Sequence, residues 1–283
     1  MKTWIQKALA SVTALGVGAM MLGTAAKAED APIMTYGVDI VSDYVFRGTD
    51  LYVRQFKDNE HSAFHVAPAA QPSATFFGPS GISLNLWGSF ATGDRADDNK
   101  TGFLGLGRDD ELDYTLAFDW SNRLGGFTAA IIYYTYFHQE YQTETVVVDA
   151  PSNTKATKAV PVQPDALFKW TMPFAKSINP YFSHYASPTH GASYDVLGIS
   201  GGESVVWAAS VGNMRQGIKD VTGKVGYVMG DFSVALNAAY RPNPELVGPY
   251  DKDGKYFVKG EEKTYPSTIA WLSLSYSGSV AAK

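Results

Sequence analysis

Cysteine is absent from all 283 residues, and only 18% of the residues are charged. Without thiols the chain can form no disulfide, no cysteine-ligated zinc site and no thiolate nucleophile. The net charge is −5, from 28 acidic and 23 basic residues, which argues against binding to the nucleic-acid backbone. The composition therefore excludes cysteine-based chemistry, and we expect no nucleic-acid partner.

Long apolar runs are also missing after residue 28, since no stretch there approaches the roughly 20 residues of a transmembrane helix. Aromatic residues are plentiful instead, with 17 Tyr, 15 Phe and 6 Trp beside 27 Gly. The mean hydropathy of −0.12 is too polar for a bundle of membrane helices. The aromatic content is too high for a disordered chain.

The first 28 residues have the pattern of a secretory signal peptide. Lys2 and Lys7 form a basic start, residues 8–23 are mostly small and apolar, and Ala26-Lys27-Ala28 is a small-x-small cleavage site. We therefore predict a signal peptide over residues 1–28 and one domain over residues 29–283. Export of this kind implies the secretion machinery as a partner.

Apolar residues in the predicted mature part recur with a period of two. Between Leu112 and Trp120 they alternate with polar or small residues, and residues 168–174 and 232–240 behave alike. Because successive side chains of a strand point to opposite faces, each segment has one apolar and one polar or small face. We predict twelve strands, over residues 36–47, 67–77, 82–91, 112–120, 127–138, 168–174, 178–186, 193–200, 204–213, 221–229, 232–240 and 267–276.

The connections between these strands alternate in length. The short ones are Gly-, Ser- or Pro-bearing turns at residues 79–81, 123–126, 175–177, 201–202 and 230–231. The long, polar ones cover residues 48–66, 92–111, 139–166, 187–192, 214–220 and 242–266. This alternation is typical of an up-and-down outer-membrane barrel, which has short turns at one rim and long loops at the other.

A closed barrel also suits a membrane, because lipid offers no hydrogen-bond partner to an open strand edge. We therefore predict an all-β fold, an antiparallel up-and-down transmembrane β-barrel of about 12 strands, with 10 or 14 as alternatives. The predicted location is the outer membrane of a Gram-negative cell. The predicted partners are outer-membrane lipid, lipopolysaccharide and the barrel-assembly machinery. Aromatic residues near strand ends, such as Tyr36, Tyr44, Phe46, Trp120 and Phe127, fit interfacial girdles.

Residues 42–48 read Ser42-Asp43-Tyr44-Val45-Phe46-Arg47-Gly48, shortly after the predicted signal peptide. This S-D-Y-x-F-R-G segment resembles the opening strand of the TorF-type porin family of proteobacterial outer-membrane proteins. The motif covers little of the chain, although the family's length and strand-rich layout match throughout. The resemblance implies a barrel in the outer membrane and adds no substrate. The chain departs from common barrels by continuing seven residues past Tyr276.

Polar residues on one face of the predicted strands would cost several kcal/mol if they faced lipid near the midplane. In residues 36–47 we expect Tyr44 and Phe46 to face lipid and the opposite face to be internal. The polar face is either a plug that only stabilises the barrel or a ring that selects ions. The lumen-lining candidates are Asp39, Asp43, Arg47, Asn85, Asp113, Asp119, Lys169, Lys224, Asn237 and Arg241.

The predicted function is a porin-like channel for passive diffusion of small solutes or ions, without catalysis, cofactor or metal. Barrels fill with side chains at about 8 strands and open at about 16–18, so twelve strands suggest a narrow pore. One alternative is a closed structural barrel whose loops bind a surface partner. A weaker alternative is an outer-membrane lipid hydrolase that uses His184 with Ser183 or Ser187, or His190 with Ser193.

Overall fold

The structure is a computed structural model. It describes residues 32–47, 49–50, 68–92, 110–136, 142–146, 156–160, 164–172, 178–187, 192–243, 255–258, 261–264 and 267–281. The predicted signal peptide lies outside the described residues, so residues 1–28 keep that interpretation as a prediction.

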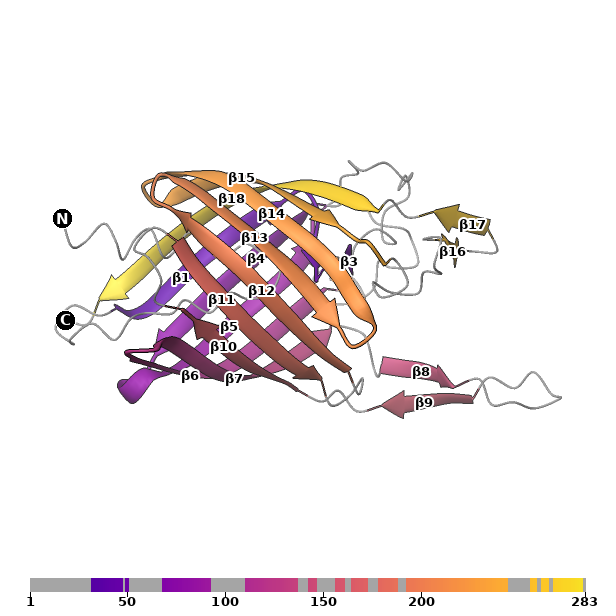
Figure 1. Cartoon of the computed structure of the whole chain (residues 1–283), viewed down its shortest axis with the longest axis horizontal. Coiled ribbons are helices and arrows are strands. Elements are labelled where there is room, and N and C mark those ends of the chain that lie inside the picture. The colour runs from indigo at the N-terminus through magenta and orange to yellow at the C-terminus, as the bar shows by residue number, and fades with distance from the viewer. Residues whose placement is uncertain are drawn as a thin grey trace.

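Twelve antiparallel strands close into a barrel, which confirms the predicted fold class and strand number (Figure 1). Each strand pairs with its sequence neighbours in the wall, and β1 pairs with both β18 and β4, so the wall has no free edge. The wall strands are β1 (Pro32–Val41), β4 (Ala69–Phe77), β5 (Ile82–Ala91), β6 (Glu111–Asn122), β7 (Gly125–Tyr136), β10 (Asp165–Thr171), β11 (Ile178–Ser187), β12 (Ala192–Gly202), β13 (Val205–Met214), β14 (Gly217–Met229), β15 (Phe232–Tyr240) and β18 (Thr268–Ala281).

Smaller elements lie in the connections. Three two-stranded sheets pair β2 (Val45–Phe46) with β3 (Thr49–Asp50), β8 (Gln142–Val146) with β9 (Ala156–Val160), and β16 (Lys255–Val258) with β17 (Glu261–Thr264). One 3-10 turn, η1 (Pro79–Gly81), joins β4 to β5. Across the described residues, no helix is long and apolar enough to cross a membrane.

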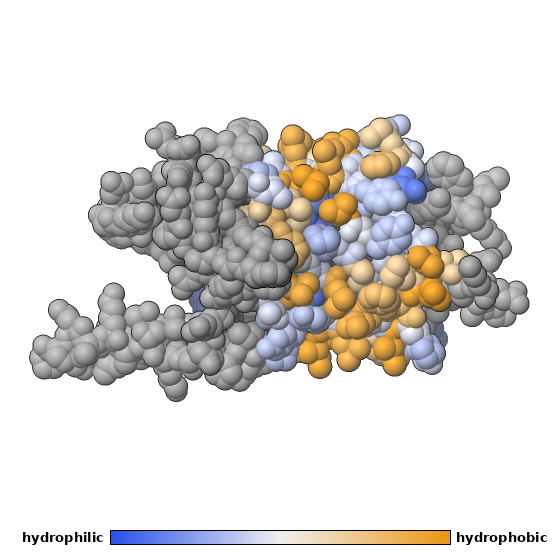
Figure 2. Space-filling model, turned by 180° about the vertical axis from the view of Figure 1, so that it is seen from behind, coloured by the Kyte–Doolittle hydropathy of each residue, from blue (hydrophilic) through white to orange (hydrophobic). Residues whose placement is uncertain are grey.

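The wall is apolar outside and polar inside, the inverse of a water-soluble domain. On β6, Leu116 and Phe118 are 55% and 45% exposed, whereas Asp113 and Thr115, which precede them on the other face of the strand, are 8% and 7% exposed. Figure 2 shows apolar side chains over much of the exposed wall. Because the period-two alternation puts the apolar set outward on strand after strand, the exterior suits contact with lipid.

Aromatic side chains cluster on the outer wall at the rim that carries the short turns. Trp120 stacks on Phe127 with ring centroids 5.3 Å apart, and Phe127 stacks on Trp170 at 6.3 Å. Trp170 Nε1 donates a hydrogen bond to the carbonyl oxygen of Leu124 in the adjacent turn, at 2.8 Å. Such rings, apolar in body and polar at one edge, suit a boundary between lipid and water.

Several sequence-based boundaries were wrong. The first strand ends at Val41, so the predicted strand over residues 36–47 does not continue, and Tyr44 is 2% exposed instead of facing lipid. The predicted long loop over residues 214–220 is a two-residue turn, because β13 runs to Met214 and β14 begins at Gly217. A register shift after Gly212 had hidden the alternation there. The last strand extends past Tyr276 to Ala281.

An arginine placed on the outer wall tests the lipid-facing assignment. Leu197 on β12 is 61% exposed, and Leu197→Arg should lower the free energy of unfolding by about 2–4 kcal/mol in a bilayer, the cost of arginine near the midplane. Denaturant titration of liposome-inserted protein measures this change. Leu124→Arg is the matched control, since Leu124 is 58% exposed in a turn and its substitution should change little. Equal effects of the two substitutions would refute the assignment.

Candidate functional site

Residues 42–47 leave the wall after β1 and fold into the barrel; we call this segment the arm. The arm is anchored to β18, because Ser42 N donates to Leu272 O at 2.9 Å and Leu272 N donates to Ser42 Oγ at 3.0 Å. Beyond this anchor, Asp43 and Tyr44 are only 1% and 2% exposed. The polypeptide that the sequence presents as a strand end is therefore an internal element.

Tyr44 fixes the first half of the arm against neighbouring strands. Its hydroxyl donates to Glu111 Oε2 on β6 at 2.7 Å, and its ring lies 5.6 Å from the ring of Trp87 on β5. Tyr44 and Val45 also pack in a buried cluster with Ile269 and Trp271 of β18. These contacts offset the entropy cost of ordering a segment that leaves the strand ladder of the wall after Val41.

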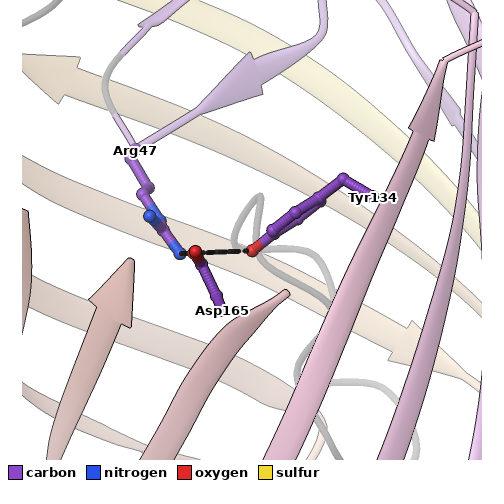
Figure 3. A network of polar contacts seen from close by, with 3 residues as sticks. All are labelled: Arg47, Tyr134 and Asp165. Carbon is purple, nitrogen blue, oxygen red and sulfur yellow. Dashed lines mark hydrogen bonds and ion pairs between the residues drawn. The ribbon is translucent and has the colours of Figure 1, made fainter. Parts of the chain in front are cut away.

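Arg47 extends the arm to the opposite wall. Its Nη2 donates to Asp165 Oδ2 at 3.1 Å and to Tyr134 Oη at 3.3 Å, and Tyr134 Oη donates to the same carboxylate oxygen at 3.2 Å (Figure 3). The guanidinium also lies over the rings of Tyr185 and Tyr194, at 4.5 and 5.0 Å from their centroids. Tyr185 belongs to β11, which stands six strands from β1 in either direction around the wall. The arm therefore spans the lumen.

The position of Arg47 is demanding for its backbone but favourable for its charge. Its φ of 47° lies in the left-handed region, which costs a non-glycine residue about 1–2 kcal/mol. Burial alone would lower the pKa of Arg47, yet the neighbouring Tyr134, Tyr185 and Asp165 raise it above its ordinary value. The guanidinium thus stays charged inside the barrel.

Polar pairs continue along the buried face below the arm. Thr128 Oγ1 donates to Asp119 Oδ1 at 2.6 Å, and Asn85 Nδ2 donates to Thr75 Oγ1 at 2.8 Å. Lys169 Nζ lies 5.0 Å from the centroid of the Tyr181 ring. These contacts join neighbouring strands of the barrel across its inner face.

The structure places all ten predicted lumen candidates on the buried or half-buried side of the wall or in the arm. Electrostatic interaction joins Asp39 with Lys224, and Asp119 with Lys169. Asp113 lies near Glu111 and Arg47. The ten side chains are those of Asp39, Asp43, Arg47, Asn85, Asp113, Asp119, Lys169, Lys224, Asn237 and Arg241.

Sequence reasoning missed the aromatic part of this site. It missed Tyr134, which lies in a run that is apolar on both faces of the strand and offers no alternation to assign. It missed Asp165 because the predicted strand began three residues too late, at residue 168. Tyr185 gave a usable signal, since it shares the polar phase of its strand with Asn179 and Ser183, but tyrosine is also enriched in interfacial girdles.

The charges on the buried side are unequal. Among the described residues, eight carboxylates face five cations there. The carboxylates are Asp39, Asp43, Asp110, Glu111, Asp113, Asp119, Asp165 and Asp220, and the cations are Arg47, Lys169, Lys219, Lys224 and Arg241. The interior of the described barrel is therefore net acidic.

The residues weighed for hydrolysis are only partly described. His184 Nδ1 lies 2.7 Å from Asp195 Oδ1, and the two side chains are 43% and 36% exposed on the outer wall. Ser183 is 3% exposed on the inner side, so it cannot act together with His184. The side chain of Ser187 and the whole of His190 lie outside the described residues.

Comparison with known proteins returns only solved structures. No family model matches the chain, and no curated protein does. A KdgM porin aligns with a TM-score of 0.46 at 5% identity, over 86% of this chain and 98% of its own. A NanC porin aligns at 0.45 and 5%, over 86% and 98%. A Rhodopseudomonas blastica porin mutant aligns at 0.35 and 8%, over 87% and 99%. These three solved structures are porins, at similarities too low to carry an argument about what this chain does.

Proposed function

We propose that this protein is a porin-like channel of the outer membrane, through which small solutes or ions diffuse passively. The observation that supports this proposal most is the closed barrel itself, which has no free strand edge. Its apolar side chains lie outside and its charged side chains lie inside. Lipid outside and water inside explain both faces at once. The signal over residues 1–28 and membership of the TorF-type porin family, which rests on residues 42–48, agree with this function.

The proposed channel is narrow and prefers cations. The arm crosses the lumen near the rim that carries the long connections and leaves less of the cross-section for passage. The excess of buried carboxylates over buried cations attracts positive ions and repels negative ones, as charged rings do in cation channels.

A closed barrel is the second candidate, and the same arm favours it. Asp43, Tyr44, Glu111 and Arg241 are nearly inaccessible, each at 2% exposure or less. If the arm leaves no path at all, the barrel is structural and its loops carry the activity. Lipid hydrolysis has no comparable support, because Ser183 faces away from His184.

Planar-bilayer conductance separates the two candidates. Residues 29–283 would be refolded in detergent, and folding would be verified by the heat-modifiable mobility typical of barrels. Discrete conductance steps with a reversal potential on the cation side in a salt gradient are the expected result. A folded barrel that gives no steps over the full voltage range would refute the channel and leave the closed barrel.

A further inference from the structure

Four residues of the wall form an aromatic and acidic cage around the guanidinium of Arg47; we call Tyr134, Asp165, Tyr185 and Tyr194 the cage. Two tyrosine rings lie 4.5 and 5.0 Å from the guanidinium carbon, within the range of a cation–π interaction. The Asp165 carboxylate neutralises the charge at 3.1 Å. Rings and a carboxylate together are the chemistry that recognises an organic cation.

The four cage residues belong to the wall, and Phe46 of the arm adds an edge contact with the Tyr134 ring at 6.1 Å. Its residues come from β7, β10, β11 and β12, which pair in succession. Tyr185 and Tyr194 face each other at 5.9 Å, and Tyr134 donates to Asp165. Because wall strands and wall contacts hold these side chains, the cage is preorganised for a cation.

The charges around the cage also favour a cation. Tyr194 Oη donates to Asp220 Oδ2 at 2.9 Å, and Asp113 interacts electrostatically with the Arg47 site. The one nearby cation among the described residues, besides Arg47 itself, is Lys219, whose Nζ lies 5.7 Å from the centroid of the Tyr194 ring. The carboxylate of Asp220 interacts electrostatically with Lys219. Carboxylates thus outnumber competing cations around the bound guanidinium.

Arg47 fits the cage imperfectly. Its backbone holds a left-handed φ of 47°, and its buried Nε has no hydrogen-bond partner among the described residues. A free solute can adopt its best orientation without these costs, so it can compete with Arg47 for the cage.

We propose that the cage is a binding site for small organic cations that carry a guanidinium group, and that Arg47 fills it as the chain's own substitute ligand. A solute that arrives at this rim displaces Arg47 and takes its contacts with Asp165 and the two rings. Binding itself requires no passage. If binding at the cage is a step in permeation, guanidinium cations are the preferred solutes of the channel; this part rests on the proposed function.

Calorimetry on the refolded chain, residues 29–283 in detergent, tests the cage with L-arginine as the probe. Arg47→Gly empties the cage and suits the left-handed backbone, and Arg47→Ala is a second variant that removes the same side chain. We expect either variant to bind L-arginine at least about tenfold more tightly than the unsubstituted chain, in which Arg47 competes. L-citrulline, which has a neutral ureido group in place of the guanidinium, should bind at least about tenfold more weakly than L-arginine.

Two further substitutions locate the site. Asp165→Asn in the emptied background should abolish the preference for L-arginine over L-citrulline. Asp195→Asn, which removes a carboxylate from the outer face of the same wall, should preserve it. Equal binding of the two ligands to a folded, emptied barrel, or a preference that survives Asp165→Asn, would overturn the cage. Because calorimetry reads binding alone, a barrel that conducts nothing would refute the channel and not the cage.

Discussion

Replacing residues 43–47 with a Gly-Ser linker of equal length should raise the single-channel conductance several-fold. The arm leaves β1, carries Tyr44 to Glu111 on β6, and carries Arg47 to Asp165 on β10 and to the Tyr185 ring on β11, six strands from β1, so it crosses the lumen. A linker without these side chains has no such contacts and removes several large groups from the path. Conductance in a narrow pore depends on its tightest cross-section, so the larger opening should dominate the result.

A matched control replaces a turn that lies away from the lumen. Substituting Arg123 and Leu124 with Gly and Ser alters an exposed turn at the other rim and should leave the step size unchanged. Both variants must first show heat-modifiable mobility, so that a loss of fold is not read as a closed pore. An arm-free barrel with the step size of the unsubstituted chain would mean that the arm does not constrict the path.

The wall could be predicted from sequence because lipid and lumen impose opposite demands on adjacent residues. Leu116 and Phe118 on one face of β6, and Asp113 and Thr115 on the other, satisfy those demands within one strand. The same alternation of apolar and polar residues recurs in each predicted strand, so twelve patterns that are weak singly support one prediction together. The alternation of short and long connections then indicates their up-and-down order.

The arm could not be predicted, because its sequence keeps the strand pattern that its structure abandons. Tyr44 and Phe46 alternate with Asp43 and Arg47 as if lipid lay on one side. Their partners are instead Trp87 and Tyr134 inside the barrel, and neither is near the arm in sequence. Only the closed wall brings these rings to the arm. The period-two alternation alone therefore predicts, wrongly, that Tyr44 and Phe46 face lipid.

The candidate site divides in the same way. Charged and amide side chains such as Asp119 and Asn237 could be assigned to the inner face from the sequence, because a charge that faces lipid is costly enough to decide the face. The tyrosines of the cage were not identified, since tyrosine is tolerated in the lumen, in the girdles and in packed cores. The pairing of Arg47 with Asp165, which are 118 positions apart, required the closed barrel.

Reversing the charge of the two lysines on the inner face, Lys169 and Lys224, should increase the cation-to-anion permeability ratio of the channel by about tenfold. Lys169 and Lys224 oppose an interior that is otherwise rich in carboxylates, and each interacts with a nearby aspartate, Asp119 and Asp39 respectively. Lys169→Glu with Lys224→Glu changes the local charge by four units. At ~10 Å in a watery lumen each unit contributes roughly 0.4 kcal/mol, with opposite sign for a cation and an anion. Screening by salt over about one Debye length reduces the combined change to about 1.4 kcal/mol, or about tenfold in the ratio.

The reversal potential in a salt gradient measures this ratio directly. The effect should shrink as the ionic strength rises, because counterions screen charges beyond about 10 Å at 0.1 M salt. Arg123→Glu with Arg215→Glu makes the same change of charge in two exposed turns and should shift the potential far less. Equal shifts from the two double variants would place the selecting charges at the rims. A large shift from the lysine pair alone would make the inner face the part of the barrel that discriminates ions, since charges beside the path lie nearest to a permeating ion and are screened least.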